Sequence, residues 1–135
     1  MNQTIARLRE AVNAHDPAAM AALMAPDYRS EQPVHPNRAF VGNRQVVANW
    51  TELFRGVPDM TVEVLAEATE GTTSFSEWSW TGHHADDSDF AVSGVIVAGL
   101  DDTGIIRWMR LYVEPVEVDS AGIADAVHGL SGTEG

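Results

Sequence analysis

The chain has 135 residues, of which 44% are hydrophobic and 21% are charged, a composition that suits one globular domain. A net charge of −12, with only eight Lys and Arg residues scattered along the chain, disfavours nucleic acid and anionic membranes as partners. The absence of cysteine excludes disulfides and thiolate zinc sites, and no apolar run approaches the roughly 20 residues that span a bilayer.

The first part of the chain predicts two helices. Apolar residues recur at helical spacing from Ile5 to Val12. Asp16 then interrupts the pattern and can cap a second helix, which would have Pro17 at its first position. An Ala-Pro-Asp run follows, so we expect the second helix to end near Ala25.

An extended segment and a third helix come next. Tyr28–Pro33 is predicted to be a short strand, and two prolines hold the loop after it extended. Gly42 opens the third helix, whose wide apolar stripe includes Trp50. Gly56 and the residues after it end this helix.

From Met60 onward the pattern changes to strands, which we expect at residues 61–68, 73–84, 90–100 and 105–114. Hairpin turns between them imply antiparallel pairing, and helices gathered on one side of such a sheet give an α+β domain. The domain is predicted to cover residues 1–118. Residues 119–135 are predicted to be a C-terminal tail that is either partly mobile or one short helix.

The strand over residues 74–84 is the most informative segment. Trp78 and Trp80 stand two residues apart, and a strand alternates its faces residue by residue. Both indoles and His84 therefore share one face. Such a face either fills a core or lines an apolar cavity, and that choice decides whether the protein holds a ligand.

Six short motifs carry a resemblance to a known family: His15-Asp16-Pro17, Ser30-Glu31-Gln32-Pro33, Gly42-Asn43-Arg44, Val57-Pro58-Asp59, Thr81-Gly82-His83-His84 and Gly104-Ile105-Ile106. Their order and spacing resemble the SnoaL-like branch of the nuclear-transport-factor-2-like superfamily over residues 3–116. The resemblance implies a cone in which three N-terminal helices pack on a curved antiparallel sheet around an internal pocket. It also implies a homodimer built through the sheet.

Members of this superfamily include polyketide cyclases and ketosteroid isomerases, but the usual catalytic acids are missing here. The two aspartates of the isomerases fall on Gln32 and Ile96, and their tyrosine falls on Leu8. An amide cannot abstract a proton at neutral pH, and an isoleucine cannot donate a hydrogen bond to an oxyanion. The cyclase histidine is matched by His84, with His83 as the neighbouring option, whereas the cyclase aspartate again falls on Ile96.

The predicted pocket is apolar and aromatic, with a few neutral polar groups. The residues expected to bind a substrate are Tyr28, Gln32, Trp50, Trp78, Trp80, Ile96, Met109 and Leu111. His84 and His35 are the candidate catalytic residues, because histidine titrates closest to neutrality. The sequence predicts no cofactor and no metal, since it lacks phosphate-loop and dinucleotide motifs and ligand spacing for a metal ion.

The opposite face of the sheet is predicted to form the homodimer interface. Its candidate residues are Glu77, Trp108, Arg110, Tyr112 and Glu114. Aromatic residues suit an interface, and the charged residues would form cross-strand ion pairs. If the register were reversed, Arg110, Tyr112 and Glu114 would enter the pocket and favour an enzyme.

Three functions remain open from the sequence. The first is a cyclase or isomerase that acts without a cofactor on a hydrophobic, polyketide- or steroid-like compound, with help from a histidine. The second is a protein that binds or sequesters such a compound without catalysis, which the missing acids favour. The third is a dimerisation module whose pocket is filled by its own side chains. Because the N-terminus lacks the features of a signal peptide, we expect a cytoplasmic protein.

Overall fold

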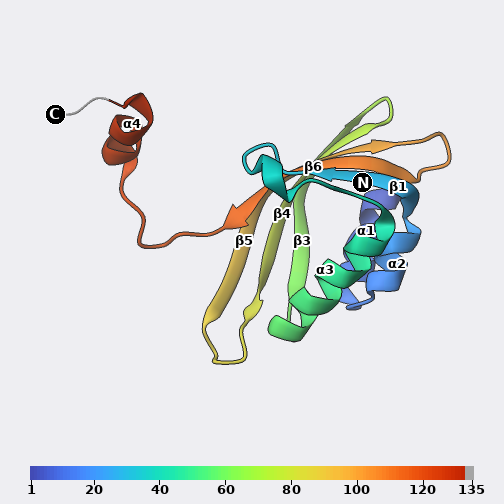
Figure 1. The fold of residues 1–135 in the computed structure, drawn as a ribbon, viewed down its shortest axis with the longest axis horizontal. Helices are drawn as coiled ribbons and strands as arrows, with labels where there is room; N and C mark the ends of the chain where they lie inside the picture. Colours follow the sequence, from blue (N-terminus) through green and yellow to red (C-terminus); the bar gives the residue numbers. More distant parts are fainter. Residues whose placement is uncertain (133–135) are drawn as a thin grey trace.

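A curved six-stranded sheet forms the body of the protein (Figure 1). The computed structural model describes residues 1–132. The strands lie side by side in the order β2-β1-β6-β5-β4-β3. Their bounds are β1 Met24–Glu31, β2 Phe40–Val41, β3 Thr61–Glu70, β4 Thr73–His83, β5 Asp89–Leu100 and β6 Ile106–Pro115. The four long strands predicted for the second half of the chain are confirmed.

Three helices pack against one face of this sheet (Figure 1), namely α1 Gln3–Asn13, α2 Pro17–Ala22 and α3 Asn43–Gly56. Asp16 caps α2 as predicted, because its Oδ1 accepts a hydrogen bond from the backbone N–H of Ala19 at 3.0 Å. A short 3-10 turn, η1 Pro36–Arg38, lies between β1 and β2. The predicted α+β class, with its N-terminal helices on a curved sheet, is confirmed.

The sheet is mixed, however, and the prediction of a wholly antiparallel sheet is wrong. Strands β3 to β6 are antiparallel neighbours, but β1 runs parallel to β6, with Ser30 opposite Met109. The long strands are joined by hairpins, which force antiparallel pairing. Most of the chain, including α3, separates β1 from β6, so no turn fixes the direction of β1. This strand also begins earlier than predicted, because Met24 already pairs with Ile106.

A β-bulge in β3 changes which of its residues face the core. Val64 lies opposite Trp78, but the next pair joins Ala66 to Glu77. The extra residue is Leu65, and its side chain is 57% exposed. One inserted residue reverses the alternation of the strand. The alternation that starts with the buried Val62 therefore continues inward only as far as Val64.

The core lies between the helices and the inner face of the sheet. Its fully buried side chains come from both layers, with Ile5 from α1, Met20 from α2, Trp78 from β4 and Ile106 from β6. Removal of this apolar surface from water is the main force that holds the helices on the sheet.

The C-terminal helix α4, Ile123–Ser131, stands apart from the body at the end of the linker that follows β6 (Figure 1). Its side chains are exposed, among them Ile123 at 80% and Leu130 at 89%. A helix thus occupies part of the predicted tail, whose last three residues lie outside the described part of the chain. No helix in the described part is both long and apolar enough to cross a membrane.

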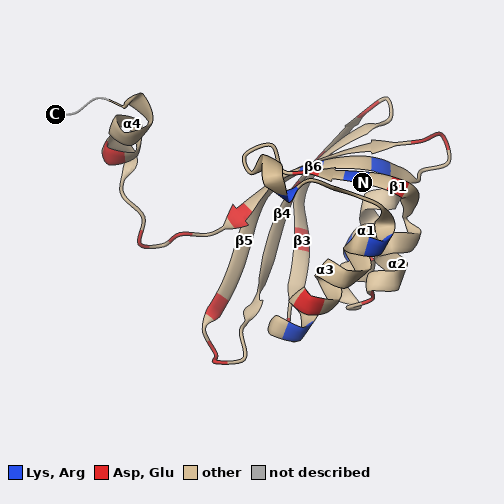
Figure 2. Cartoon of the chain, viewed as in Figure 1, with Lys and Arg blue, Asp and Glu red and all other residues tan. Residues whose placement is uncertain are grey.

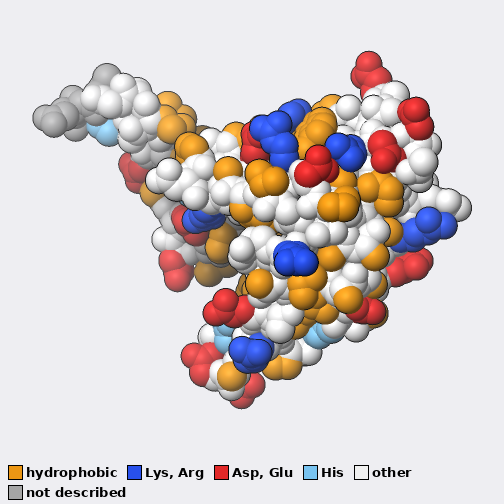
Figure 3. Space-filling model, turned by 45° about the vertical axis from the view of Figure 1, so that its right-hand side comes forward, with side chains coloured by type: hydrophobic (Ala, Val, Ile, Leu, Met, Phe, Trp, Pro, Cys, Tyr) orange, Lys and Arg blue, Asp and Glu red, His pale blue; other side chains and the backbone are white. Residues whose placement is uncertain are grey.

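Acidic residues gather at the hairpin tips and along the linker to α4 (Figure 2). Arginine side chains are instead scattered among hydrophobic and acidic groups on the face seen in Figure 3. This distribution agrees with the absence of a basic patch in the sequence.

Candidate functional site

A cavity of about 310 Å³ lies between the helices and the inner face of the sheet. Every residue predicted to bind a substrate lies in its wall: Tyr28, Gln32, Trp50, Trp78, Trp80, Ile96, Met109 and Leu111. The other polar members of the wall are Ser30, Arg38 and Asn49, and no Asp, Glu or His is among the lining residues. These residues thus lie together around one hollow, and their role in binding stays a prediction.

The tryptophans form an aromatic wall. Trp78 is only 2% exposed, and its Nε1–H donates to Ser76 Oγ at 2.8 Å, so this donor is already satisfied within the protein. Trp80 packs on Trp50 of α3, with ring centroids 5.1 Å apart. Sheet and helix thus meet through indole contacts at the pocket, and Trp78 is a fixed part of its wall.

Tyr28, Ser30 and Gln32 form a line of polar groups along the inner side of β1 and its end. They are spaced two apart, so strand alternation points them to the same side, and all three line the cavity. Burial raises the pKa of the Tyr28 hydroxyl to about 12, and a hydrogen bond with Ser30 offsets this only in part. At neutral pH the hydroxyl keeps its proton, so it can donate a hydrogen bond to a ligand but cannot act as a base.

The loop between β1 and β2 adds two polar pairs beside the pocket. Arg38 Nη1 donates to Gln32 Oε1 at 2.9 Å, and both side chains line the cavity. His35 Nε2 lies 2.6 Å from Glu114 Oε1, a contact that ties the loop to the end of β6. Glu114 stands between two lining residues of β6, but neither His35 nor Glu114 is itself part of the wall.

The candidate catalytic histidines therefore both lie outside the lining residues. His84 is exposed, and its ring packs edge-on against Phe90, with centroids 5.6 Å apart and planes at 88°. The predicted alternation holds for Trp78 and Trp80, but β4 ends at His83, so His84 belongs to the loop and leaves the pattern. The ring of Phe90, which lines the pocket, is the part of the wall that His84 stacks against edge-on.

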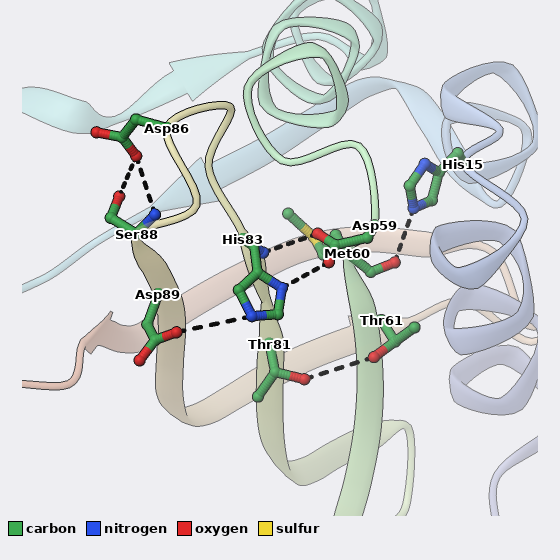
Figure 4. A network of polar contacts seen from close by, with 9 residues as sticks. All are labelled: His15, Asp59, Met60, Thr61, Thr81, His83, Asp86, Ser88 and Asp89. Atoms are coloured by element: carbon green, nitrogen blue, oxygen red, sulfur yellow. Dashed lines mark hydrogen bonds and ion pairs between the residues drawn. The ribbon is translucent and has the colours of Figure 1, made fainter.

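A separate polar network surrounds His83 at the end of β4 (Figure 4). Asp59 Oδ1 accepts the backbone N–H of His83 at 2.7 Å, and Asp59 Oδ2 lies 2.7 Å from His83 Nδ1. Asp89 Oδ1 lies 3.7 Å from His83 Nε2 on the other side of the ring. These contacts join the α3–β3 loop to β4, outside the pocket wall. Within residues 1–132 no group of three or more His, Asp or Glu side chains is arranged to hold a metal ion.

The residues predicted for a dimer interface point away from the cavity. Their exposed members are Glu77, Tyr112 and Glu114, and Trp108 and Arg110 are half-buried. The Arg110 guanidinium lies over the Trp108 ring, 4.4 Å from its centroid. The register is therefore the one that turns the β4 indoles inward, and the reversed register is excluded.

Sequence reasoning missed two polar residues of the wall, Arg38 and Asn49. Arg38 follows β1 in a proline-bounded loop, where no alternation predicts the direction of a side chain. Asn49 is adjacent to Trp50 on α3, and a prediction from the apolar stripe alone passes over it. The available signal for Arg38 was its distance of only six residues from Gln32.

Comparisons with known proteins agree with this architecture. A family model described as the SnoaL-like domain matches residues 5–127. No curated protein is significantly similar to the chain. Among solved structures, a candidate SnoaL-like polyketide cyclase from Jannaschia is 24% identical with a TM-score of 0.71, and the match covers 83% of each chain.

Two further solved structures share the fold. IdmH, a candidate polyketide cyclase from Streptomyces antibioticus, is 21% identical with a TM-score of 0.72, over 82% of this chain and 89% of that one. A protein with a ketosteroid isomerase-like fold from Catenulispora acidiphila, in complex with trimethylamine, is 16% identical with a TM-score of 0.70. That match covers 80% of this chain and 82% of that one.

Proposed function

We propose that this chain, which belongs to the SnoaL-like domain family, binds a small and largely hydrophobic molecule in the cavity between its helices and its sheet. One observation carries the proposal: the inward-facing rings and aliphatic side chains leave a hollow of about 310 Å³ unfilled. Ligand pockets are concave, mostly apolar and provided with a few placed polar groups. The unfilled interior counts against a module whose pocket is closed by its own side chains.

The polar groups on β1 suggest the chemistry of the ligand. Tyr28 keeps its proton, and Ser30 and Gln32 follow it along the same wall. All three side chains can donate hydrogen bonds, and all three lie on one side of a mostly apolar chamber. A flat hydrophobic compound with oxygen atoms along one edge, such as a polyketide- or steroid-like molecule, fits this arrangement.

Binding or sequestering is favoured over catalysis because the pocket wall lacks an acid–base group suited to neutral pH. The lining residues include no Asp, Glu or His. The raised pKa of Tyr28 keeps its hydroxyl protonated at neutral pH, so this residue cannot accept a proton from a substrate. General acid–base catalysis needs a group within hydrogen-bond reach of the reacting atoms and with a pKa near the working pH.

A cyclase- or isomerase-like reaction is the second candidate function. It is favoured by the His35–Glu114 contact of 2.6 Å, which lies beside the β6 end of the pocket. A carboxylate that holds one imidazole nitrogen leaves the other available as an acid or base. The likeness to candidate polyketide cyclases points the same way but extends to the fold alone.

Tryptophan fluorescence tests the proposal, because Trp50 and Trp80 line the cavity. A panel of polyaromatic and enone compounds is titrated into the protein, and each compound is then recovered and examined by mass spectrometry. We expect saturable quenching with at least one compound, which is recovered unchanged. A recovered product that disappears in His35→Ala or His84→Ala would instead establish the second candidate.

Matched substitutions locate the binding. Val113 lines the cavity, whereas Val95 lies on the outer face and is 38% exposed. Val113→Phe should weaken binding of a bulky compound by about tenfold or more, because the added ring occupies ligand volume. Val95→Phe makes the same change outside and should leave the affinity unaltered. Equal affinities in the two variants would contradict binding in this cavity.

A further inference from the structure

Arg38 differs from every other residue of the pocket wall. Among the described lining residues it alone carries a formal charge, in a wall that is otherwise apolar or neutral. Its guanidinium belongs to the turn η1, at an exposed position, so it lies at the border between the cavity and solvent. A single charge placed at the entrance of an apolar chamber points to a ligand with one polar end.

No carboxylate neutralises this guanidinium among residues 1–132. Two other arginines do have such partners, since Arg29 pairs with Glu31 and Arg107 pairs with Asp27, each at 3.4 Å. Glu114, an acid that contacts this loop, is held by His35 at 2.6 Å. Within residues 1–132 Arg44 and Arg110 also lack an ion pair, so Arg38 is set apart because it combines an uncompensated charge with a place in the pocket wall.

The contact with Gln32 prepares Arg38 for recognition of an anion. Gln32 Oε1 accepts one N–H from Arg38 Nη1 at 2.9 Å, which orients the planar group and uses one of its five donors. The remaining donors form a fork that matches the two oxygens of a carboxylate. A neutral partner orients the guanidinium without cancelling its charge.

From these observations, and resting on the proposed function, we infer that the ligand is an amphipathic carboxylic acid. Its apolar ring system occupies the aromatic chamber, and its carboxylate binds Arg38 at the entrance. Arg38 is then the residue that distinguishes an acid from a neutral compound of the same shape.

The test compares two probes of equal shape, a naphthoic acid and the naphthamide substituted at the same ring position, by fluorescence titration. We expect the native protein to bind the acid about tenfold to a hundredfold more tightly, as is typical for hydrogen bonds between charged groups. Arg38→Gln should abolish this preference and leave the affinity for the amide within about twofold. Added NaCl should weaken binding of the acid and spare that of the amide.

Arg44→Gln is the matched control, because it removes the same charge from an exposed position outside the pocket wall. It should retain the preference for the acid. If the native protein binds both probes equally, or if Arg38→Gln keeps the preference, the inference on Arg38 is wrong while the pocket proposal stands. If neither probe quenches the fluorescence, the inference is wrong, and the proposed function fails with it only if the panel of polyaromatic and enone compounds gives no quenching either.

Discussion

At the scale of single residues, Asp59 and His83 hold the α3–β3 loop against the end of β4. Asp59 accepts both the backbone N–H and the ring of His83, each at 2.7 Å (Figure 4). The hydrogen bond that the His83 ring donates to Asp59, and then the charge of Asp59, raise the pKa of His83 above its ordinary 6.5. The same contact lowers the pKa of Asp59 below its ordinary 3.8. Each group thus favours the charged form of the other, although both are exposed to solvent.

These shifts predict a window of pH in which the pair stabilises the fold. The contribution of His83 is complete below its ordinary pKa of 6.5 and is lost as the pH rises through the raised value. The contribution of Asp59 is complete above 3.8 and is lost as the pH falls through the lowered value. We expect Asp59→Asn to reduce thermal stability most between these two ordinary values, as measured by unfolding across a pH series.

The pKa of His83 itself, followed by NMR titration, checks the cause. In Asp59→Asn it should fall toward 6.5, because the neutral amide accepts a weaker hydrogen bond from the ring and carries no charge. Asp89→Asn is the control, since Asp89 lies 3.7 Å from the ring and is a weaker cause of the shift. An unchanged His83 pKa in Asp59→Asn would contradict the assignment.

Individual residues also show where prediction from sequence succeeds. Trp78, Trp80 and Ile96 lie on long strands, where alternation gives the side of every residue once one is known, and all three line the cavity. His84 and Arg38 lie in loops, where no period exists. The first was predicted to face inward and does not, and the second lines the pocket without having been predicted.

At the scale of elements, local sequence signals predicted the hairpins. They did not predict the pairing of strands that are far apart in the sequence. The Asp101 turn between β5 and β6 has its own chemistry, since the Asp101 carboxylate accepts hydrogen bonds from Thr103 and Ile105. The parallel pairing of β1 with β6 has no such local signal, because it depends on how distant segments pack. The bulge at Leu65 could not be predicted from the sequence either, because a single inserted residue leaves the apolar pattern of β3 almost unchanged.

The helix α4 gives a prediction at this scale. Residues 119–132 are exposed throughout, so they bury little apolar surface against the body. Deletion of residues 119–135 should therefore alter the free energy of unfolding by no more than about 0.5 kcal/mol, the usual range for surface changes. Chemical denaturation of the full and shortened chains, followed by tryptophan fluorescence, measures this difference.

A deeper deletion is the control for α4. Removal of residues 113–135 also takes away the end of β6, where Val113 pairs with Gly94 and lines the cavity. That chain should unfold or lose most of its stability. If deletion of residues 119–135 were equally damaging, the predicted domain of residues 1–118 would be wrong.

At the scale of the whole molecule, the sheet has one covered face and one open face. The helices cover the inner face (Figure 1). On the outer face Phe75, Val95 and Tyr112 are 44%, 38% and 41% exposed, and Val95 is the cross-strand neighbour of Tyr112. Glu77 and Arg110 lie among them. We therefore expect this open face, which combines apolar and charged groups, to be an interaction surface.

We expect two copies of the chain to pair through this face, and sedimentation equilibrium should give the mass of a dimer. Val95→Lys should yield a monomer, because pairing would bury an added charge at the centre of the interface. Val118→Lys makes the same change in the linker, where Val118 is 86% exposed, and should leave the dimer intact. Both variants reduce the magnitude of the net charge of −12 by one unit, so weaker repulsion between copies cannot explain a loss of pairing in only one.

For the native chain, added salt should strengthen pairing, because it screens the repulsion between two acidic copies. A native monomer, or a Val95→Lys variant that still pairs, would show that the open face is not the interface.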